Sequence, residues 1–334
     1  MLDDRRARIL QALVEEYIRT GQPVSSRAIL DSSELQVSSA TVRNDLAKLE
    51  SYGFVAQPHT SAGRVPTHQG YRYYVDHCSP ARLRNATRIR IESFFTDVHA
   101  ELSKLLQETS GLLSDLSSYP AVVVGPGLGE EKVVGLHLVP LSPNVLLAVT
   151  IAESGRVVRD IVRLKGEISD TDLHRAESVL AKVYAQRTLQ DGRTRARDIP
   201  SGELSDPVRR TVRLVSDALT SAETSTQDIY VGGTSHLAAM WEDIAQVHSM
   251  LDLLEHDSLI RQMVDNPQSG TAVRMGAELD VDGVELAVVS SDYEAGEHGF
   301  GRVGVIGPMR MDYRRTIKIV EEVSDGLGES LGST

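Results

Sequence analysis

The sequence is poor in several features that mark particular protein classes. It contains a single cysteine, Cys78, which excludes an intrachain disulfide and a cysteine-rich zinc cluster and is typical of a reducing cytoplasm. No run of about 18 uncharged apolar residues occurs, and the N-terminal MLDDRRARIL lacks a continuous apolar stretch. We therefore expect a cytoplasmic chain with neither a signal peptide nor a membrane partner.

Sequence signatures of catalysis and metal binding are also missing. There is no Gly-x-Ser-x-Gly elbow and no His-Glu-x-x-His pair. The glycines of 125–129 lead into Glu130 and Glu131, which would repel a phosphate, and 280–283 lacks the length of a calcium loop. Residues 232–235 could cradle an anion but are more typical of a tight turn with a helix cap. We expect no catalytic site, no cofactor and no metal.

The chain also lacks an overall positive charge. It has 35 Lys and Arg against 47 Asp and Glu, and the net charge of −12 argues against nucleic-acid binding when taken whole. The distribution is uneven, however: residues 1–90 carry a balance of +4, and residues 91–334 one of −16. A basic N-terminal module on an acidic body is typical of a DNA-binding protein, although charge alone leaves a surface fluctuation as the alternative.

The first 66 residues predict three helices and a hairpin. Apolar residues at helical spacing predict a helix over 4–20, which Gly21 and Pro23 end. Ser25 and Ser38 are expected to cap two further helices, the last of which ends at Gly53. Short strands on either side of 58–63 complete a winged helix-turn-helix, whose second motif helix enters the major groove of DNA. The alternative is a generic three-helix bundle with a surface hairpin.

The third helix has the side chains that a DNA-reading surface needs. Its predicted exposed face lacks the Glu/Lys ladder of a merely solvated helix and holds Ser39, Thr41, Arg43, Asn44 and Lys48. Arg43 and Asn44 suit bidentate base contacts, each contributing about 1–3 kcal/mol of discrimination. Lys48 and Arg64 suit phosphates. Arg43 could instead pair with Asp45 or a neighbouring acid.

Three motifs of this region resemble one family of proteins. They are Ser38-Ser39-Ala40-Thr41-Val42-Arg43-Asn44-Asp45-Leu46, then Gln57-Pro58-His59-Thr60-Ser61-Ala62-Gly63-Arg64-Val65-Pro66-Thr67, then Gly70-Tyr71-Arg72-Tyr73-Tyr74-Val75-Asp76. This run closely resembles the HrcA family of heat-inducible transcription repressors of bacterial chaperone operons. The resemblance implies that His59, Thr60, Ser61 and Arg64 form the wing and that Tyr71 and Arg72 lie on a helix behind it. The predicted DNA-binding set is Ser39, Thr41, Arg43, Asn44, Lys48, His59, Thr60, Ser61, Arg64 and Arg72.

The acidic body predicts an α+β fold. Apolar spacing predicts one long helix over 82–116, packed in the core or forming a coiled-coil seam, followed by strands at 121–124, 133–139, 145–151 and 157–164. Strands at 283–291 and 301–306 and a C-terminal helix come after a mainly helical stretch, whose polar segment 191–197 is a hinge candidate. Strands framed by helices in this order suit an antiparallel sheet.

At 334 residues, two or three domains are expected. The resemblance implies a GAF-like domain interrupted by a dimerisation insert, and 304–313 is close to that family's C-terminal signature. We predict a winged helix-turn-helix domain at 1–80, a discontinuous GAF-like domain at 81–168 and 266–334, and a mainly helical inserted dimerisation domain at 169–265.

The resemblance further implies a homodimer that binds double-stranded DNA at an inverted-repeat operator and is modulated by the GroEL chaperonin. Dimerisation also makes physical sense, since one helix-turn-helix reads only a half-site. Two other interpretations stay open: a small-molecule sensor with a ligand in the GAF-like domain, and intrinsic heat sensing by a marginally stable body.

Overall fold

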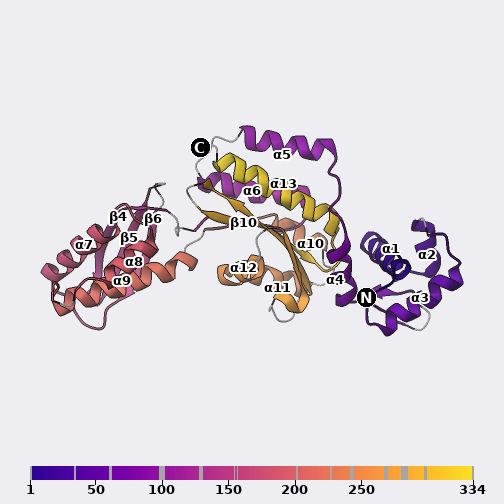
Figure 1. The fold of residues 1–334 in the computed structure, drawn as a ribbon, viewed down its shortest axis with the longest axis horizontal. Helices are drawn as coiled ribbons and strands as arrows, with labels where there is room; N and C mark the ends of the chain where they lie inside the picture. The colour runs from indigo at the N-terminus through magenta and orange to yellow at the C-terminus, as the bar shows by residue number, and fades with distance from the viewer. Residues whose placement is uncertain are drawn as a thin grey trace. The chain divides into compact units, whose positions relative to one another are not determined.

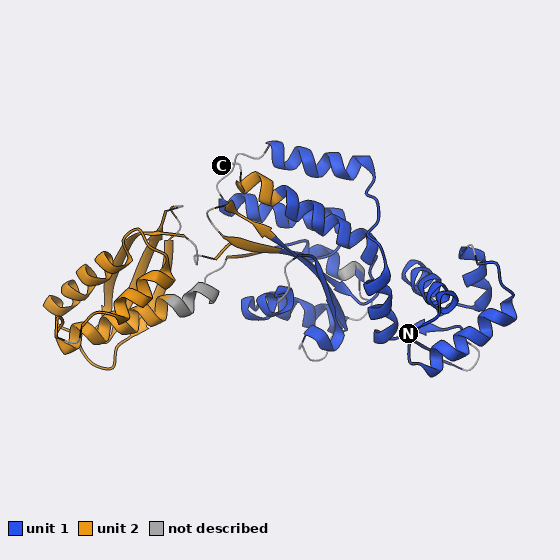
Figure 2. Cartoon of the chain, in the orientation of Figure 1, with its two compact units in different colours: residues 1–123, 231–292, 303–326 blue, residues 124–230, 293–302, 327–334 orange. Residues whose placement is uncertain are grey.

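A computed structural model describes residues 2–33, 35–59, 62–97, 102–127, 131–153, 155, 157–200, 202–225, 228–240, 244–266, 270–279, 285–296 and 299–332. Figure 1 shows the order of the elements along the chain. The chain divides into two compact units, coloured in Figure 2: unit 1 is 1–123, 231–292 and 303–326, and unit 2 is 124–230, 293–302 and 327–334.

Residues 4–77 form the predicted winged helix. Its helices are α1 (Asp4–Thr20), α2 (Ser26–Ser32), α3 (Ser39–Ser51) and α4 (His68–His77), and its wing strands are β1 (Val55–Ala56) and β2 (Val65–Pro66). Ser25 and Ser38 each accept a backbone N–H of the turn that follows, as the sequence predicts. Gly21 ends α1 in the left-handed conformation, at φ 68°.

The segment predicted as one long helix forms two helices instead. These are α5 (Asn85–Asp97) and α6 (Leu102–Ser117), and Arg90 of α5 forms an ion pair with Asp115 of α6 at 2.7 Å. In one straight helix these residues would lie about 37 Å apart, at 1.5 Å per residue. The two helices therefore run in opposite directions, which the apolar periodicity could not reveal because it continues through both of them.

A five-stranded sheet forms the centre of the body. Its strand order is β7 (Ile229–Gly232), β3 (Ala121–Val124), β10 (Phe300–Pro308), β9 (Leu286–Glu294) and β8 (Ala272–Met275). The helices around it are α10 (Leu237–Met240), α11 (Ile244–Leu254), α12 (Asp257–Val264) and α13 (Tyr313–Gly332). Helices cover both faces (Figure 1): Val264 of α12 approaches Gly304 of β10, and Ser324 of α13 hydrogen-bonds Ser291 of β9.

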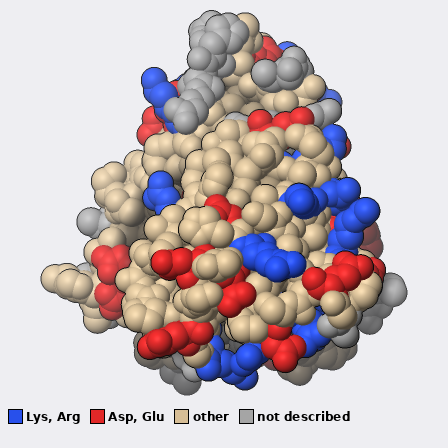
Figure 3. Space-filling model, turned by 90° about the vertical axis from the view of Figure 1, so that its left-hand side faces the viewer, with Lys and Arg blue, Asp and Glu red and all other residues tan. Residues whose placement is uncertain are grey.

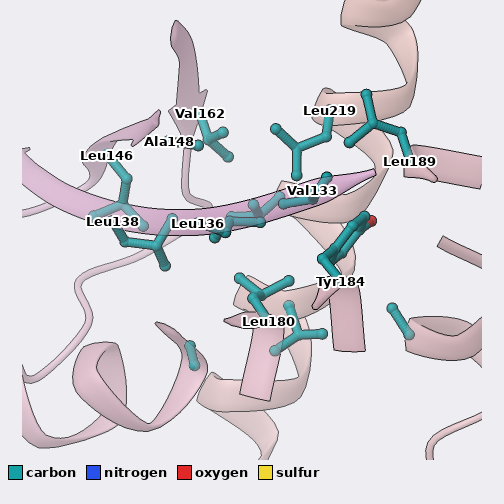
Figure 4. Packing of buried hydrophobic residues seen from close by; sticks show 14 of the residues in the cluster. Val133, Leu136, Leu138, Leu146, Ala148, Val162, Leu180, Tyr184, Leu189 and Leu219 are labelled. Carbon is teal, nitrogen blue, oxygen red and sulfur yellow. The ribbon is translucent and has the colours of Figure 1, made fainter. Parts of the chain in front are cut away.

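A separate three-stranded antiparallel sheet lies in unit 2. Its order is β4 (Val133–Ser142), β5 (Val145–Ala152) and β6 (Val157–Arg163). Three helices complete this body: α7 (Asp170–Tyr184), α8 (Leu189–Arg197) and α9 (Asp206–Ser225). Figure 4 shows Leu136 and Leu138 of β4 packed in the same cluster as Leu180 and Tyr184 of α7.

This arrangement changes the predicted domain boundaries. Strands β4–β6, predicted to belong to the GAF-like sheet, share their buried core with α7–α9. Helices α10–α12, predicted within the insert, belong to unit 1. The interruption of the five-stranded sheet therefore runs from about Val124 to Tyr230 rather than over 169–265, and it is a mixed α/β body. The sequence could not show which sheet each strand joins.

The hinge candidate at 191–197 lies inside a helix. Thr188 caps α8 by accepting the backbone N–H of Asp191, and Gly192 in its second turn packs against the ring of Tyr184. A Cβ at position 192 would lie 2.2 Å from that ring, so the glycine permits close packing between α7 and α8. Residues 280–283, which are too short for a calcium loop, lie outside the described residues.

The described residues include neither a membrane-spanning helix nor a cluster of metal-binding side chains. No described helix is both long and apolar enough to cross a membrane. No group of three or more His, Cys, Asp or Glu within the same residues could hold a metal ion.

Candidate nucleic-acid interface

Helix α3 has a buried face and an exposed polar face. Its buried residues include Val42, Leu46 and Leu49, which pack into the N-terminal module. The opposite face exposes Arg43, Asn44 and Lys48, together with two alanines. Exposed cationic and amide groups beside small side chains leave room for a base edge to approach, as direct reading of the major groove requires.

Asp45 is the exception on the buried face. Its side chain is 3% exposed and accepts hydrogen bonds from Arg5 Nε at 2.7 Å, Arg5 Nη2 at 3.2 Å and Arg6 Nε at 3.2 Å. These bonds, those from Arg5 above all, lower the pKa of the carboxyl against the opposing effect of burial. Two α1 arginines thus fix α3 in place, and the suggested pairing of Arg43 with Asp45 is wrong.

The start of α3 is organised by hydroxyl groups. Ser38 Oγ accepts the backbone N–H of Thr41 at 3.1 Å and lies 2.9 Å from Thr41 Oγ1. Ser39 Oγ lies 3.1 Å from Ser26 Oγ on α2, and Arg43 Nε donates to Ser26 at 3.4 Å. The predicted contacts Ser39 and Thr41 are therefore half-buried in the first turn of α3, whereas Arg43 lies on the exposed surface.

The wing is anchored to the turn between α1 and α2. Val24 and Arg64 exchange two backbone hydrogen bonds, each of 2.8 Å. Gly63 fits beside them because it has no Cβ. A Cβ at this position would lie 2.4 Å from the carbonyl oxygen of Val24. Of the predicted wing residues, His59 is exposed, while Thr60 and Ser61 lie outside the described residues.

The Arg64 side chain reaches back to α3. Its Nη2 lies 2.9 Å from Glu50 Oε2, and the side chain is 18% exposed. This ion pair joins the base of the wing to the C-terminal part of α3. A phosphate contact by Arg64, which stays a prediction, would have to share the guanidinium with Glu50.

The Arg72 side chain on α4 forms hydrogen bonds with the body. Its guanidinium bonds Asp76 on α4, and Nη1 donates to the carbonyl oxygen of Val273 at 2.7 Å and to Glu278 at 3.3 Å. The body therefore engages the side chain that the sequence predicts as a DNA contact. A DNA contact by Arg72 stays a prediction, and a phosphate would have to compete with two carboxylates and a carbonyl for the guanidinium.

Known proteins identify the family to which this arrangement belongs. The family model "Winged helix-turn-helix transcription repressor, HrcA DNA-binding" matches residues 1–76, and "HrcA protein C terminal domain" matches residues 103–317. The chain belongs to the HrcA family. The N-terminal match covers α1 to α4 almost entirely, which confirms the winged helix.

Full-length relatives of the HrcA family agree with this result. A heat-inducible transcription repressor HrcA from Halalkalibacterium halodurans is 35% identical over 340 residues, covering 99% of this chain and 98% of the relative. Another from Frankia casuarinae is 36% identical, with both chains covered completely. These relatives are named as repressors rather than enzymes, in agreement with the lack of catalytic motifs. A solved crystal structure of a hypothetical protein is 26% identical, covers 100% of this chain and 99% of its own, and has a TM-score of 0.63.

The sequence interpretation missed Arg5 and Arg6 as residues that position the reading helix. A signal was present: Asp45 falls on the same helical stripe as Val42, Leu46 and Leu49. A carboxylate on an inward stripe needs a cationic partner, because an unpaired buried charge is strongly unfavourable. Arg5 and Arg6 lie on α1, against which α3 packs.

Proposed function

We propose that this chain represses transcription of heat-shock chaperone operons by occupying an inverted-repeat operator as a homodimer. The observation that carries the proposal is the exposed face of α3. Arg43 and Lys48 are exposed there, and neither forms an ion pair within the described part of the chain. Their charges are free to meet phosphates and base edges.

The exposed residues divide into two roles. Arg43 and Asn44 can each form paired hydrogen bonds with a base, Arg with guanine and Asn with adenine. Lys48, nearer the C-terminus of α3, would contact phosphate and contribute to affinity and salt dependence. We expect Arg43→Ala to lower affinity and relax base preference, and Lys48→Ala to flatten the salt dependence while preserving the preference.

Dimerisation is supported by the uncovered face of the unit 2 sheet. Strand β5 buries alternate residues under the helices, and its other residues face outward. Across that outward face, Leu147 pairs with Val139 on one side and Ile161 on the other, and Val139 and Ile161 are 43% and 64% exposed. An apolar sheet face of this kind is a typical association surface.

The charges on unit 2 agree with a role away from DNA. Figure 3, seen from the side of unit 2, shows Asp and Glu intermixed with Lys and Arg, and a broad area with neither. No continuous basic area covers this view, whereas binding DNA along the backbone requires one. The face in this view is therefore better suited to association than to DNA contact.

Modulation by a GroEL-type chaperonin rests on the family resemblance. In that scheme the chaperonin keeps the repressor in its DNA-binding form, and unfolded proteins that occupy the chaperonin during heat stress relieve repression. The decisive experiment is footprinting of the purified full chain on its own upstream DNA, with and without chaperonin. Two symmetric protected half-sites support the dimeric repressor, and protection that is absent in both conditions contradicts it.

A pocket in unit 2 favours a ligand-responsive repressor as the second candidate. This open pocket of about 300 Å³ lies between the β6–α7 connection and α9, and its apolar lining includes Leu164, Ile168 and Leu214. Arg210 and Arg213 also line it, so an amphipathic anion is the chemical class that fits. Operator binding that responds to a small carboxylate such as a medium-chain fatty acid, without chaperonin, would favour this candidate. Arg213→Ala should abolish the response.

A further inference from the structure

Two sequence motifs that lie far apart in the chain meet in unit 1. Tyr71, in the motif of residues 70–76, packs against Tyr313, at the end of the motif of residues 304–313, with ring centroids 6.1 Å apart. Both rings are buried. The DNA-binding module and the body therefore share a packed interface, to which both motifs contribute.

Arg72 provides the polar part of this interface. Nη1 donates to the Val273 carbonyl on β8 at 2.7 Å and to Glu278 Oε2 at 3.3 Å, in the turn after β8. Nε and Nη2 donate to Asp76 Oδ1 at 2.9 and 2.6 Å, which fixes the plane of the guanidinium. Glu278 in turn accepts the backbone N–H of Met275 at 3.1 Å, so its carboxylate is positioned by β8.

Further hydrogen bonds surround Arg72. His68 Nε2 lies 3.0 Å from the carbonyl oxygen of Met275. From the body, Arg314 donates to the Ser79 carbonyl at 2.9 Å and to Glu15 on α1 at 3.3 Å. The winged helix is thus attached to the body at α1, at α4 and at the residue after Cys78, which restrains its orientation.

We propose that Arg72 is a positioning residue: it orients the DNA-binding module on the body through Val273 and Glu278 and does not itself contact DNA. The proposal rests on the proposed operator binding. In a dimer, two winged helices must present α3 at the spacing of two half-sites, so a fixed orientation reduces the ordering cost of binding. Any change in the body that moves β8 or Glu278 would then alter operator affinity without touching α3.

The test compares Arg72→Gln, Glu278→Gln and the double variant in the full chain. Binding to the footprinted operator is measured by fluorescence anisotropy over a series of salt concentrations. Each single variant should bind about five- to tenfold more weakly, within the usual range for coupling between two sites. The salt slope should stay at the wild-type value, and the double variant should be no weaker than either single one.

The matched control is Arg197→Gln, which removes an arginine from an exposed ion pair with Asp217 in unit 2. It should bind the operator like the wild type. A phosphate contact by Arg72 predicts different results: Arg72→Gln would reduce the salt slope by about one, and Glu278→Gln would leave affinity unchanged or raise it. Either result overturns the proposal, as does tighter binding by both single variants.

Different results would contradict the proposed function and the positioning role of Arg72. If the wild-type chain binds no inverted repeat in its upstream DNA, the proposed function is wrong. If the wild type binds and both single variants equal it, only the positioning role is wrong. Should Arg72→Gln fail to fold, Glu278→Gln decides alone, because Glu278 lies outside the DNA-binding module and the proposal requires it to weaken operator binding.

Discussion

Asp45 allows a quantitative test of how the reading helix is held in place. We consider Asp45→Asn, which preserves the size of the side chain and removes its charge. The carboxylate accepts three hydrogen bonds from Arg5 and Arg6 and is 3% exposed. A hydrogen bond to a charged group contributes about 1.5–3 kcal/mol. Because Arg5 is 48% exposed and can return to water, we expect a total loss of about 2 kcal/mol rather than the ~3–5 kcal/mol of a fully buried pair.

The pH dependence of this effect has a definite sign. The folded state lowers the pKa of Asp45, so the stabilisation is complete above the ordinary aspartate pKa of about 3.9 and is lost as the pH falls through the lower folded value. Asparagine does not titrate. The difference in stability between wild type and Asp45→Asn should therefore be constant near neutral pH and shrink below pH ~4.

Amide hydrogen exchange of peptides from α1 and α3 measures this difference locally, which matters in a chain of several domains. The matched control is Asp31→Asn, whose carboxylate lies 3.8 Å from Arg27 in a pair that is exposed on both sides. That variant should change exchange very little. Equal exchange in the two variants at neutral pH would refute the assigned role of Asp45, and so would a difference that persists unchanged in acid.

Two other predictions concern the wing and the dimer. Gly63→Ala should destabilise the winged helix by about 1–3 kcal/mol, because its Cβ would lie 2.4 Å from the Val24 carbonyl oxygen. Gly166→Ala, where a Cβ meets nothing within 4 Å, is the control in thermal unfolding, and equal melting temperatures would contradict the assignment. Ile161→Glu should shift the chain towards monomer in sedimentation, because the charge enters the outward sheet face, whereas the exposed Arg175→Glu on α7 should not. A dimer unaffected by Ile161→Glu would place association elsewhere.

Local signals explain what the sequence could predict. The caps at Ser25 and Ser38 and the left-handed Gly21 depend on neighbouring residues, and all three occur as expected. The exposed positions of Arg43 and Lys48 follow from helical periodicity. The two backbone hydrogen bonds between Arg64 and Val24 join segments about 40 residues apart, so no local sequence pattern predicts them.

Errors arose where two different folds have the same periodicity. The apolar spacing over 82–116 fits one helix or two antiparallel ones, and the Arg90–Asp115 pair distinguishes them. Alternating residues in β4–β6 predict strands correctly but do not say which sheet they join. An arginine in a basic segment also has two interpretations, since the same side chain suits a phosphate or a carboxylate.

The basic residues of the DNA-binding module fall into two groups, those that stabilise the module and those that are available to DNA. Arg5 and Arg6 form ion pairs with Asp45 inside the module, and Arg72 forms one with Glu278 of the body. Acidic residues of the chain itself therefore largely neutralise these three charges. Arg43 and Lys48 are left exposed on one face of α3. The number of Lys and Arg residues in 1–90 therefore overstates the positive charge available to DNA. Specific binding then depends on a few correctly placed groups, while the acidic body limits non-specific attraction to phosphate.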